Sequence, residues 1–168
     1  MVARDISYRM PDMLTAAQYE AIGRFALAFN EIEFLLEVYI EQFLGTPEWA
    51  VASVLAKEGG FSNKLHRFKK VLSAIAAKHP ALKVDTDIVS AITNEAQQVA
   101  DKRNQYVHAL VVEDLRTKQA NLLIKGNPPA PFNDKEIAAL IAKAQGLADQ
   151  GNRGNRGNRG RSPRFRVF

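Results

Sequence analysis

Six large apolar residues near the start of the chain recur at alternating steps of four and three: Phe25, Phe29, Ile32, Leu36, Tyr39 and Phe43. This spacing marks one face of a long α-helix, and such a face has to be covered by other elements. Just upstream, the stretch TAAQ at Thr15–Gln18 fits a capping box that opens the helix. The chain is therefore expected to fold around a long amphipathic helix near its start.

Turn and cap residues divide the rest of the chain into further elements. Glycines at Gly45 and Gly59–Gly60 and the proline at Pro80 are natural stops. Helix starts are expected at Ser62, at Asp85 or Thr86, and at Asn133–Glu136. The β-rich stretches LVVEDL and ANLLIK flank the polar RTKQ and predict a short hairpin, and GNPPAPF reads as a loop. The expected fold is mainly all-α, a bundle of about five helices with a small β-hairpin before the last one.

Size and composition narrow the class of protein. The 168 residues, 46% of them hydrophobic, are enough for one domain with its own core. Cysteine is absent, which excludes disulfides and thiolate metal sites and fits a reducing compartment. No apolar run approaches the ~20 residues of a membrane span, and MVARDISYRMPDML lacks the apolar segment of a signal peptide. We expect a cytoplasmic protein without membrane contact.

The net charge of +5 comes from the C-terminal end of the chain. GNRGNRGNRGRSPRFRVF repeats Gly-Asn-Arg three times and contains six arginines and no acid, so the first 150 residues carry about −1. This composition cannot bury apolar area and predicts a disordered basic tail. We expect an N-terminal extension at 1–14, a helical domain at 15–149 and a tail at 150–168. The tail either binds RNA phosphates through Arg153, Arg156, Arg159 and Arg161 or is only a solubilising extension; binding would make RNA affinity salt-sensitive while leaving folding independent of the tail.

The fourth expected helix carries an unusual cation. Its apolar stripe comprises Ile88, Ile92, Ala96, Val99, Val107 and Leu110, and Arg103 lies on the same stripe. A cation on an apolar face has to be paired or has to meet another chain or a ligand, because burying it alone is costly. The first helix offers Glu33 and Glu37 as possible partners.

A polar seam runs beside that stripe, formed by Gln97, Asp101, Asn104 and His108. Asn104 lies one turn before His108 and is expected to hold its ring by a hydrogen bond. Histidine moves protons near neutral pH, and arginine offers a planar fork of donors for phosphate. The pair is a minimal set for cleaving RNA without metal or cofactor, although on an ideal helix the two side chains diverge by about 140°.

The stretch RNQYVHA at Arg103–Ala109 resembles the R-x4-H signature of the HEPN superfamily (higher eukaryotes and prokaryotes nucleotide-binding domains). The long first helix and the position of the motif near the end of the fourth helix agree with this resemblance. It implies a homodimeric, metal-independent endoribonuclease of a toxin–antitoxin or phage-defence system, with a composite site at the dimer interface. In that reading Arg103 and His108 are catalytic, Asn104 supports them, and an antitoxin or a nucleotidyltransferase is a possible partner. Leu110 stands where some toxin members have a tyrosine, so regulation by modification of that tyrosine is not supported.

The same residues permit plainer interpretations. His108 suits the negative end of a helix dipole, and Arg103 paired with a carboxylate would serve structure alone. The chain would then be a non-catalytic helical dimer that acts as an interaction or nucleic-acid-binding module. The basic run KLHRFKK around His66 is interpreted as a solvated helix face in preference to an RNA-binding track.

Overall fold

The computed structural model describes residues 14–44, 49–80, 85–114, 117, 119–124 and 128–156. Within them lie α1 (Ala16–Leu44), α2 (Trp49–Lys57), α3 (Phe61–Lys78), α4 (Thr86–His108), β1 (Leu110–Asp114), β2 (Gln119–Leu123), β3 (Ala130–Pro131) and α5 (Asp134–Arg156). The predicted five-helix bundle with a hairpin before the last helix is thus confirmed. No helix in this described part of the chain is long and apolar enough to cross a membrane.

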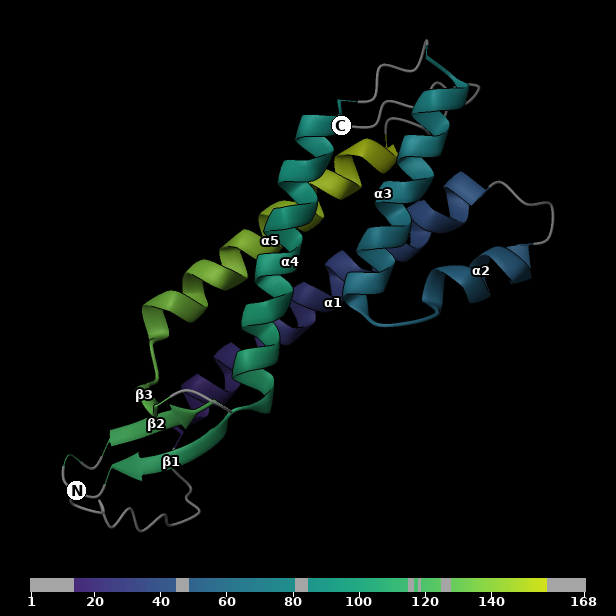
Figure 1. Ribbon diagram of the computed structural model, residues 1–168. Helices are drawn as coiled ribbons and strands as arrows, with labels where there is room; N and C mark the ends of the chain where they lie inside the picture. Colours follow the sequence, from purple (N-terminus) through teal and green to yellow (C-terminus); the bar gives the residue numbers. More distant parts are fainter. Residues whose placement is uncertain are drawn as a thin grey trace, which may run out of the picture.

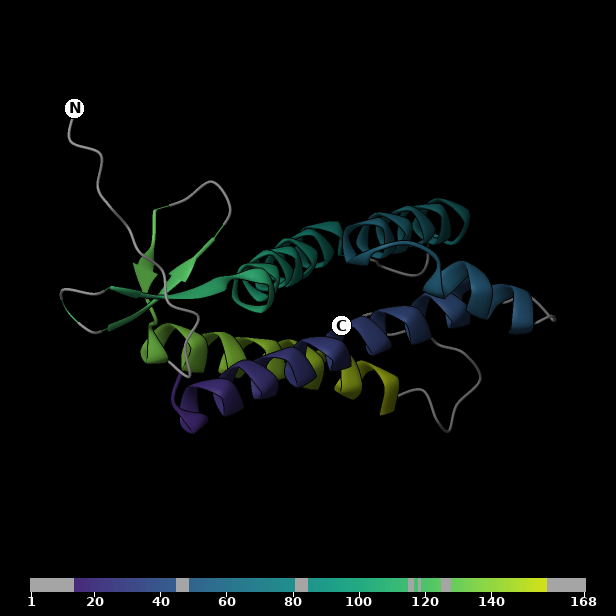
Figure 2. The same ribbon diagram turned by 90° about the horizontal axis from the view of Figure 1, so that it is seen from below.

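The helices form two layers, with α1 and α5 side by side in one layer and α3 and α4 in the other (Figure 2). The order of contacts along α1 shows that α3 runs in the same direction. Phe29 packs against Phe61 with ring centroids 4.8 Å apart, and ten residues later Tyr39 meets Phe68 at 6.2 Å. The small sheet lies at the end of the bundle where α4 finishes and α5 begins (Figure 1).

Both sequence features that predicted the first helix, the capping box and the apolar stripe, are present in α1. Thr15 and Gln18 make a reciprocal capping box: the Thr15 N–H donates to Gln18 Oε1 at 3.0 Å, and the Gln18 N–H donates to Thr15 Oγ1 at 3.2 Å. Of the predicted stripe, Phe25, Phe29, Ile32 and Leu36 are buried. Phe25 is fully buried and lies edge-on to Tyr106 of α4, so α1 supplies the centre of the core.

The other helix starts agree with the sequence in two cases out of three. Asp85 caps α4 by accepting from the N–H groups of Asp87 and Ile88, each at 3.0 Å. Asn133 caps α5 by accepting from the Glu136 N–H at 3.1 Å. The predicted cap at Ser62 is wrong, because α3 begins at Phe61 and its cap residue is Gly60, which has no side chain to offer.

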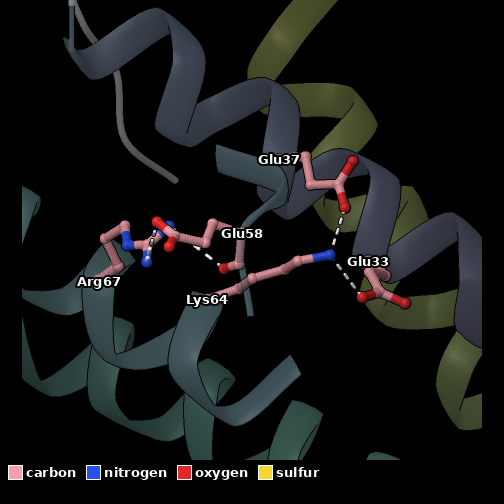
Figure 3. Close-up of polar contacts among 5 residues, drawn as sticks. All are labelled: Glu33, Glu37, Glu58, Lys64 and Arg67. Carbon is pink, nitrogen blue, oxygen red and sulfur yellow. Dashed lines mark hydrogen bonds and ion pairs between the residues drawn. The ribbon is translucent and has the colours of Figure 1, made fainter. Parts of the chain in front are cut away.

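A buried cation joins α3 to α1. Lys64 is 5% exposed, and its ammonium group donates to Glu33 Oε1 at 2.7 Å and also to Glu37 Oε1 (Figure 3). Burial alone would lower the pKa of Lys64, but the hydrogen bonds and charges of the two glutamates outweigh burial and raise this pKa above its usual range. Lys64 is therefore a permanent cation between two carboxylates that lie one turn apart on α1.

The hairpin joins α4 to α5 and extends by one short strand. β1 pairs with β2 in antiparallel register, with Val111 opposite Leu122, and β2 pairs in turn with β3. Leu122 is buried in the main core, which attaches the sheet to the helices. The stretch GNPPAPF, expected to be loop throughout, contributes Ala130 and Pro131 to the sheet edge, a place where a residue without an N–H is tolerated.

The last helix runs farther than predicted. The expected end at Gly146–Gln150 is wrong, since α5 continues through the first two Gly-Asn-Arg units to Arg156. Gly151 is buried and its carbonyl accepts from the Tyr39 hydroxyl at 2.6 Å, while the Asn152 amide donates to Glu31 Oε1 at 3.2 Å. A Cβ on residue 151 would lie 3.2 Å from Leu35 Cδ1, so glycine suits this close approach to α1. The first repeat thus belongs to the folded domain, and residues 157–168 lie outside the described part.

This finding leads to a truncation prediction. A chain that ends after Arg156 keeps the hydrogen bonds of Gly151 and Asn152, whereas a chain that ends after Gln150 cannot form either of them. We expect the shorter chain to be less stable by about 1–2 kcal/mol, since each net hydrogen bond contributes about 1 kcal/mol. Denaturant unfolding of the two truncations measures this difference. Equal midpoints would place the domain boundary back at residue 150.

Candidate functional site

The inward face of α4 differs from the predicted stripe. Ala96 and Val99 are buried as expected, but Ile88, Val107 and Leu110 are exposed. The buried set comprises Val89, Thr93, Ala96, Val99, Ala100 and Tyr106. α4 packs against α1, α3 and α5 together, so its buried arc is broader than one stripe.

The last turn of α4 extends beyond the start of α3 (Figure 1). Val107, one turn after Arg103 on the inward side, is therefore 39% exposed, and Leu110 at the start of β1 is 60% exposed. Together with Asn104 and His108, which are both exposed, they form the surface that we call the α4 end.

Arg103 lies on the inward side of α4, as predicted, and is half-buried. Its guanidinium carbon lies 5.4 Å from the centroid of the Phe29 ring, a cation–π contact. Its Nη1 donates to Asn104 Oδ1 at 3.1 Å. Its Nε is the one buried side-chain nitrogen or oxygen in the described part of the chain that has no hydrogen-bond partner. Such an unsatisfied donor costs about 1–3 kcal/mol, which is more than a protein ordinarily leaves uncompensated.

The carboxylates expected beside Arg103 are occupied elsewhere. Glu33 and Glu37 both bind Lys64, so the predicted ion pair between Arg103 and one of these glutamates is wrong. The physical reason is that α3 places Lys64 between the two carboxylates, and a buried lysine has the greater need for them. Among the described residues Arg103 has no anionic partner.

Asn104 orients the arginine instead of the histidine. The expected hydrogen bond from Asn104 to the His108 ring is absent among the described residues, and the Asn104 oxygen accepts from Arg103 instead. This contact directs the guanidinium to the side of α4 on which Asn104 lies. Asn104 and His108 are four residues apart and about 40° apart around the helix, compared with about 140° for Arg103 and His108. The hydrogen bond therefore turns Nη1 of Arg103 towards the side of α4 that also carries His108.

A carboxylate of α5 holds the same part of α4 in place. Glu136 accepts from the Lys102 ammonium at 2.7 Å and from the Tyr106 hydroxyl at 3.2 Å. Tyr106 is buried between Phe25 and Phe132, and its pKa is raised by burial and by the charge of Glu136. Lys102 and Tyr106 are one turn apart and bracket Arg103, so Glu136 fixes the last turns of α4 against the start of α5. From the sequence, Glu136 is expected only to take part in the cap of α5. The one sequence feature that indicates its contacts with α4 is the spacing of Lys102 and Tyr106, which are four residues apart and therefore lie on the same side of that helix.

The Glu136 contact makes stability depend on pH. The hydrogen bond from Lys102, ahead of the opposing effect of burial, lowers the pKa of Glu136. A carboxyl with a lowered folded pKa stabilises the fold above its unfolded pKa of about 4.3 and loses this contribution as pH falls through the folded value.

We therefore expect Glu136→Gln to be less stable than the wild type by about 1 kcal/mol at pH 7, with a difference that shrinks below pH ~4.5. Denaturant unfolding across this pH range measures the effect, and Glu20→Gln on the exposed face of α1 is the control. A difference that stays constant with pH would contradict the assigned role of Glu136.

Two of the four predicted tail arginines lie within the described residues. Arg153 is exposed on α5 and donates from Nε to the Asp149 carbonyl at 3.4 Å, and Arg156 ends the helix. Arg159 and Arg161 lie outside the described residues. α5 begins near the sheet and ends at the opposite end of the bundle, so Arg153 is far from the α4 end (Figure 1). Within the described ranges no three His, Asp or Glu side chains gather as a possible metal-ligand set.

Comparisons of the chain with protein-family models, with curated proteins and with solved structures gave no match.

Proposed function

We propose that this protein is a metal-independent endoribonuclease of the HEPN type, with a composite active site formed by two α4 ends. The observation that carries the proposal is the state of Arg103. Its Nε is buried without a partner, Asn104 orients its Nη1, and no described carboxylate neutralises it. A half-buried arginine in this state is suited to receive an anion, and the planar fork of its donors matches a phosphate.

The proposed reaction uses His108 and Arg103 in separate roles. An imidazole accepts the proton of a ribose 2′-hydroxyl while the 2′-oxygen attacks the adjacent phosphorus. The bond from phosphorus to the 5′-oxygen breaks, and that oxygen takes a proton from a second imidazole. The products are a 2′,3′-cyclic phosphate and a 5′-hydroxyl. Arg103 stabilises the negative charge that develops on the phosphate oxygens.

Two protomers supply what one helix does not. Each α4 end presents one exposed histidine, and a two-fold axis between two α4 ends would bring both histidines and both arginines to one cleft. The exposed Val107 and Leu110 beside His108 provide apolar area for such a contact. The dimer would also cover the side of α4 that the start of α3 leaves open.

The dimer is directly testable. Light scattering at micromolar concentration is expected to give twice the 18.7 kDa mass of the chain. Leu110→Glu, which places a charge in the apolar part of the α4 end, is expected to shift the protein towards monomer, whereas Leu27→Glu on α1 serves as the matched exposed control. A wild type that stays monomeric at these concentrations rules out the composite site.

A toxin–antitoxin or phage-defence setting, with an antitoxin or nucleotidyltransferase partner, follows from the resemblance alone. A specific observation favours a second candidate, the non-catalytic helical dimer. Arg103 contacts Phe29, and His108 is the last residue of α4, where the helix dipole stabilises a cation. Both residues then have structural reasons to be where they are.

The experiment that separates the two candidates is RNA cleavage by the pure protein in excess EDTA. Labelled single-stranded RNAs of varied sequence are incubated with the dimer, and the product ends are identified. The proposal expects cleavage that persists in EDTA and leaves 2′,3′-cyclic phosphates. Cleavage that EDTA abolishes excludes this mechanism, and a dimer that cleaves none of the RNAs favours the scaffold.

A further inference from the structure

The outward side of α3 carries an uncompensated positive charge. Four cations reach solvent from this helix, Arg67, Lys69, Lys70 and Lys78, and we call this surface the α3 basic face. The helix Phe61–Lys78 contains no acidic residue. Its buried lysine, Lys64, is already bound by two glutamates and plays no part in this surface.

The lysines of the α3 basic face differ in their pairing from Lys102 on α4 and Lys143 on α5. Lys102 binds Glu136 at 2.7 Å and Lys143 binds Glu95 at 3.3 Å. On α3, Lys69 contacts only a neutral amide, that of Asn94, at 3.3 Å. Lys70 and Lys78 have no ion pair or hydrogen bond within the described part of the chain.

Arg67 is the one cation of the α3 basic face with a described carboxylate neighbour. Its Nη2 lies 3.8 Å from Glu58 Oε2, and Glu58 is largely exposed (Figure 3). An exposed pair at that distance contributes little, so the face keeps most of its charge.

The shape of this surface suits a backbone that carries charge at regular intervals. Ser73, Ala74 and Ala77 are exposed between the lysines and have small side chains. A phosphate backbone can approach such a helix closely, while the flexible lysine side chains reach individual phosphates.

The α3 basic face continues into the candidate active site. Lys69 contacts Asn94 of α4, and Asn94 belongs to a polar stripe that descends α4 at steps of four and three. Its members are Ser90, Asn94, Gln97, Asp101, Asn104 and His108. Asp101 is the one acid among them, and it accepts from the Gln97 amide at 2.8 Å. A strand held by Lys69 and Lys70 would thus follow the α4 stripe towards His108.

We propose that the α3 basic face binds the phosphate backbone of the RNA and directs the strand along α4 to His108. The choice of RNA as the polyanion rests on the proposed function. The binding itself does not require cleavage, so the two proposals can be tested apart.

The test measures binding in a cleavage-null background. Full-length His108→Ala protein is titrated with a labelled single-stranded RNA at several salt concentrations, with and without Lys69→Gln and Lys70→Gln together. Removing two cations that each neutralise one phosphate of a single strand should reduce the slope of log affinity against log salt by about 1.4 and weaken binding about 25-fold near 0.1 M salt. The control removes two exposed cations of the other layer, Arg24→Gln with Lys135→Gln, and thermal unfolding checks that every variant is folded.

Each outcome decides one proposal. A selective decrease of affinity and slope in the Lys69/Lys70 variant supports the α3 basic face. An unchanged slope, or an equal decrease in the control pair, overturns it even if the wild type cleaves RNA. A wild type that binds RNA through this face but never cleaves it leaves the inference standing and removes the proposed nuclease.

Discussion

Replacing His108 by alanine is expected to lower the rate of RNA cleavage by a factor of about 10²–10⁴ without unfolding the protein, because this is the usual contribution of a general acid–base group. The side chain is exposed and has no hydrogen bond or ion pair in the described part of the chain, so its loss should cost little stability. The matched control is His79→Ala, since His79 is an exposed histidine at the end of α3. Initial rates on a labelled RNA, with circular dichroism to check folding, measure both quantities.

Arg103 provides the second arm of the same prediction. Arg103→Lys keeps the charge and a contact with Phe29 but loses the planar fork, so cleavage should also fail. Asn104→Ala should reduce cleavage less, because Asn104 only orients the guanidinium. Asn104→Asp should be worse than Asn104→Ala, since a carboxylate at that distance would neutralise Arg103. Full activity in His108→Ala, or in Arg103→Lys, would rule out the proposed roles.

The second large effect concerns stability. Replacing Lys64 by methionine is expected to destabilise the protein by about 3 kcal/mol or more, because it leaves Glu33 and Glu37 close together without their cation. Lys70→Met, an exposed change on the same helix, should stay within about 0.5 kcal/mol of the wild type. Denaturant unfolding at pH 7 measures both.

The rescue variant separates charge from packing. Adding Glu33→Gln and Glu37→Gln to Lys64→Met removes the uncompensated charges, and most of the lost stability should return. Because the folded pKa of Lys64 is raised, the stability that it confers is present below the ordinary lysine pKa of about 10.4 and is lost only as pH rises through the folded value. Lys64→Met with wild-type stability, or a triple variant as unstable as the single one, would contradict this account.

The sequence by itself determined the five helices, the hairpin and their order. The stripe from Phe25 onward, the capping box at Thr15 and Gln18, and the caps at Asp85 and Asn133 all appear in the structure as predicted. These features act within about one helical turn, so neighbouring residues suffice to specify them. The position of Arg103 on the inward side of α4 is likewise specified by local sequence, because it follows from the helical spacing of neighbouring apolar residues.

Only the tertiary structure decided which side chains meet. Lys64 binds Glu33 and Glu37, which are about 30 residues away in the sequence. Arg103 then contacts only Phe29 and Asn104 among the described residues. Glu136 on α5 binds Lys102 and Tyr106 on α4. Gly151 continues α5 because Leu35 and Tyr39 lie against it, although Gly-Asn-Arg units have poor helix propensity. The residues next to a glutamate in the sequence do not indicate which cation its carboxylate binds in the folded protein. Which cation a carboxylate binds depends on which helix packs next to it. It also depends on which buried charge would lose the most free energy without a partner.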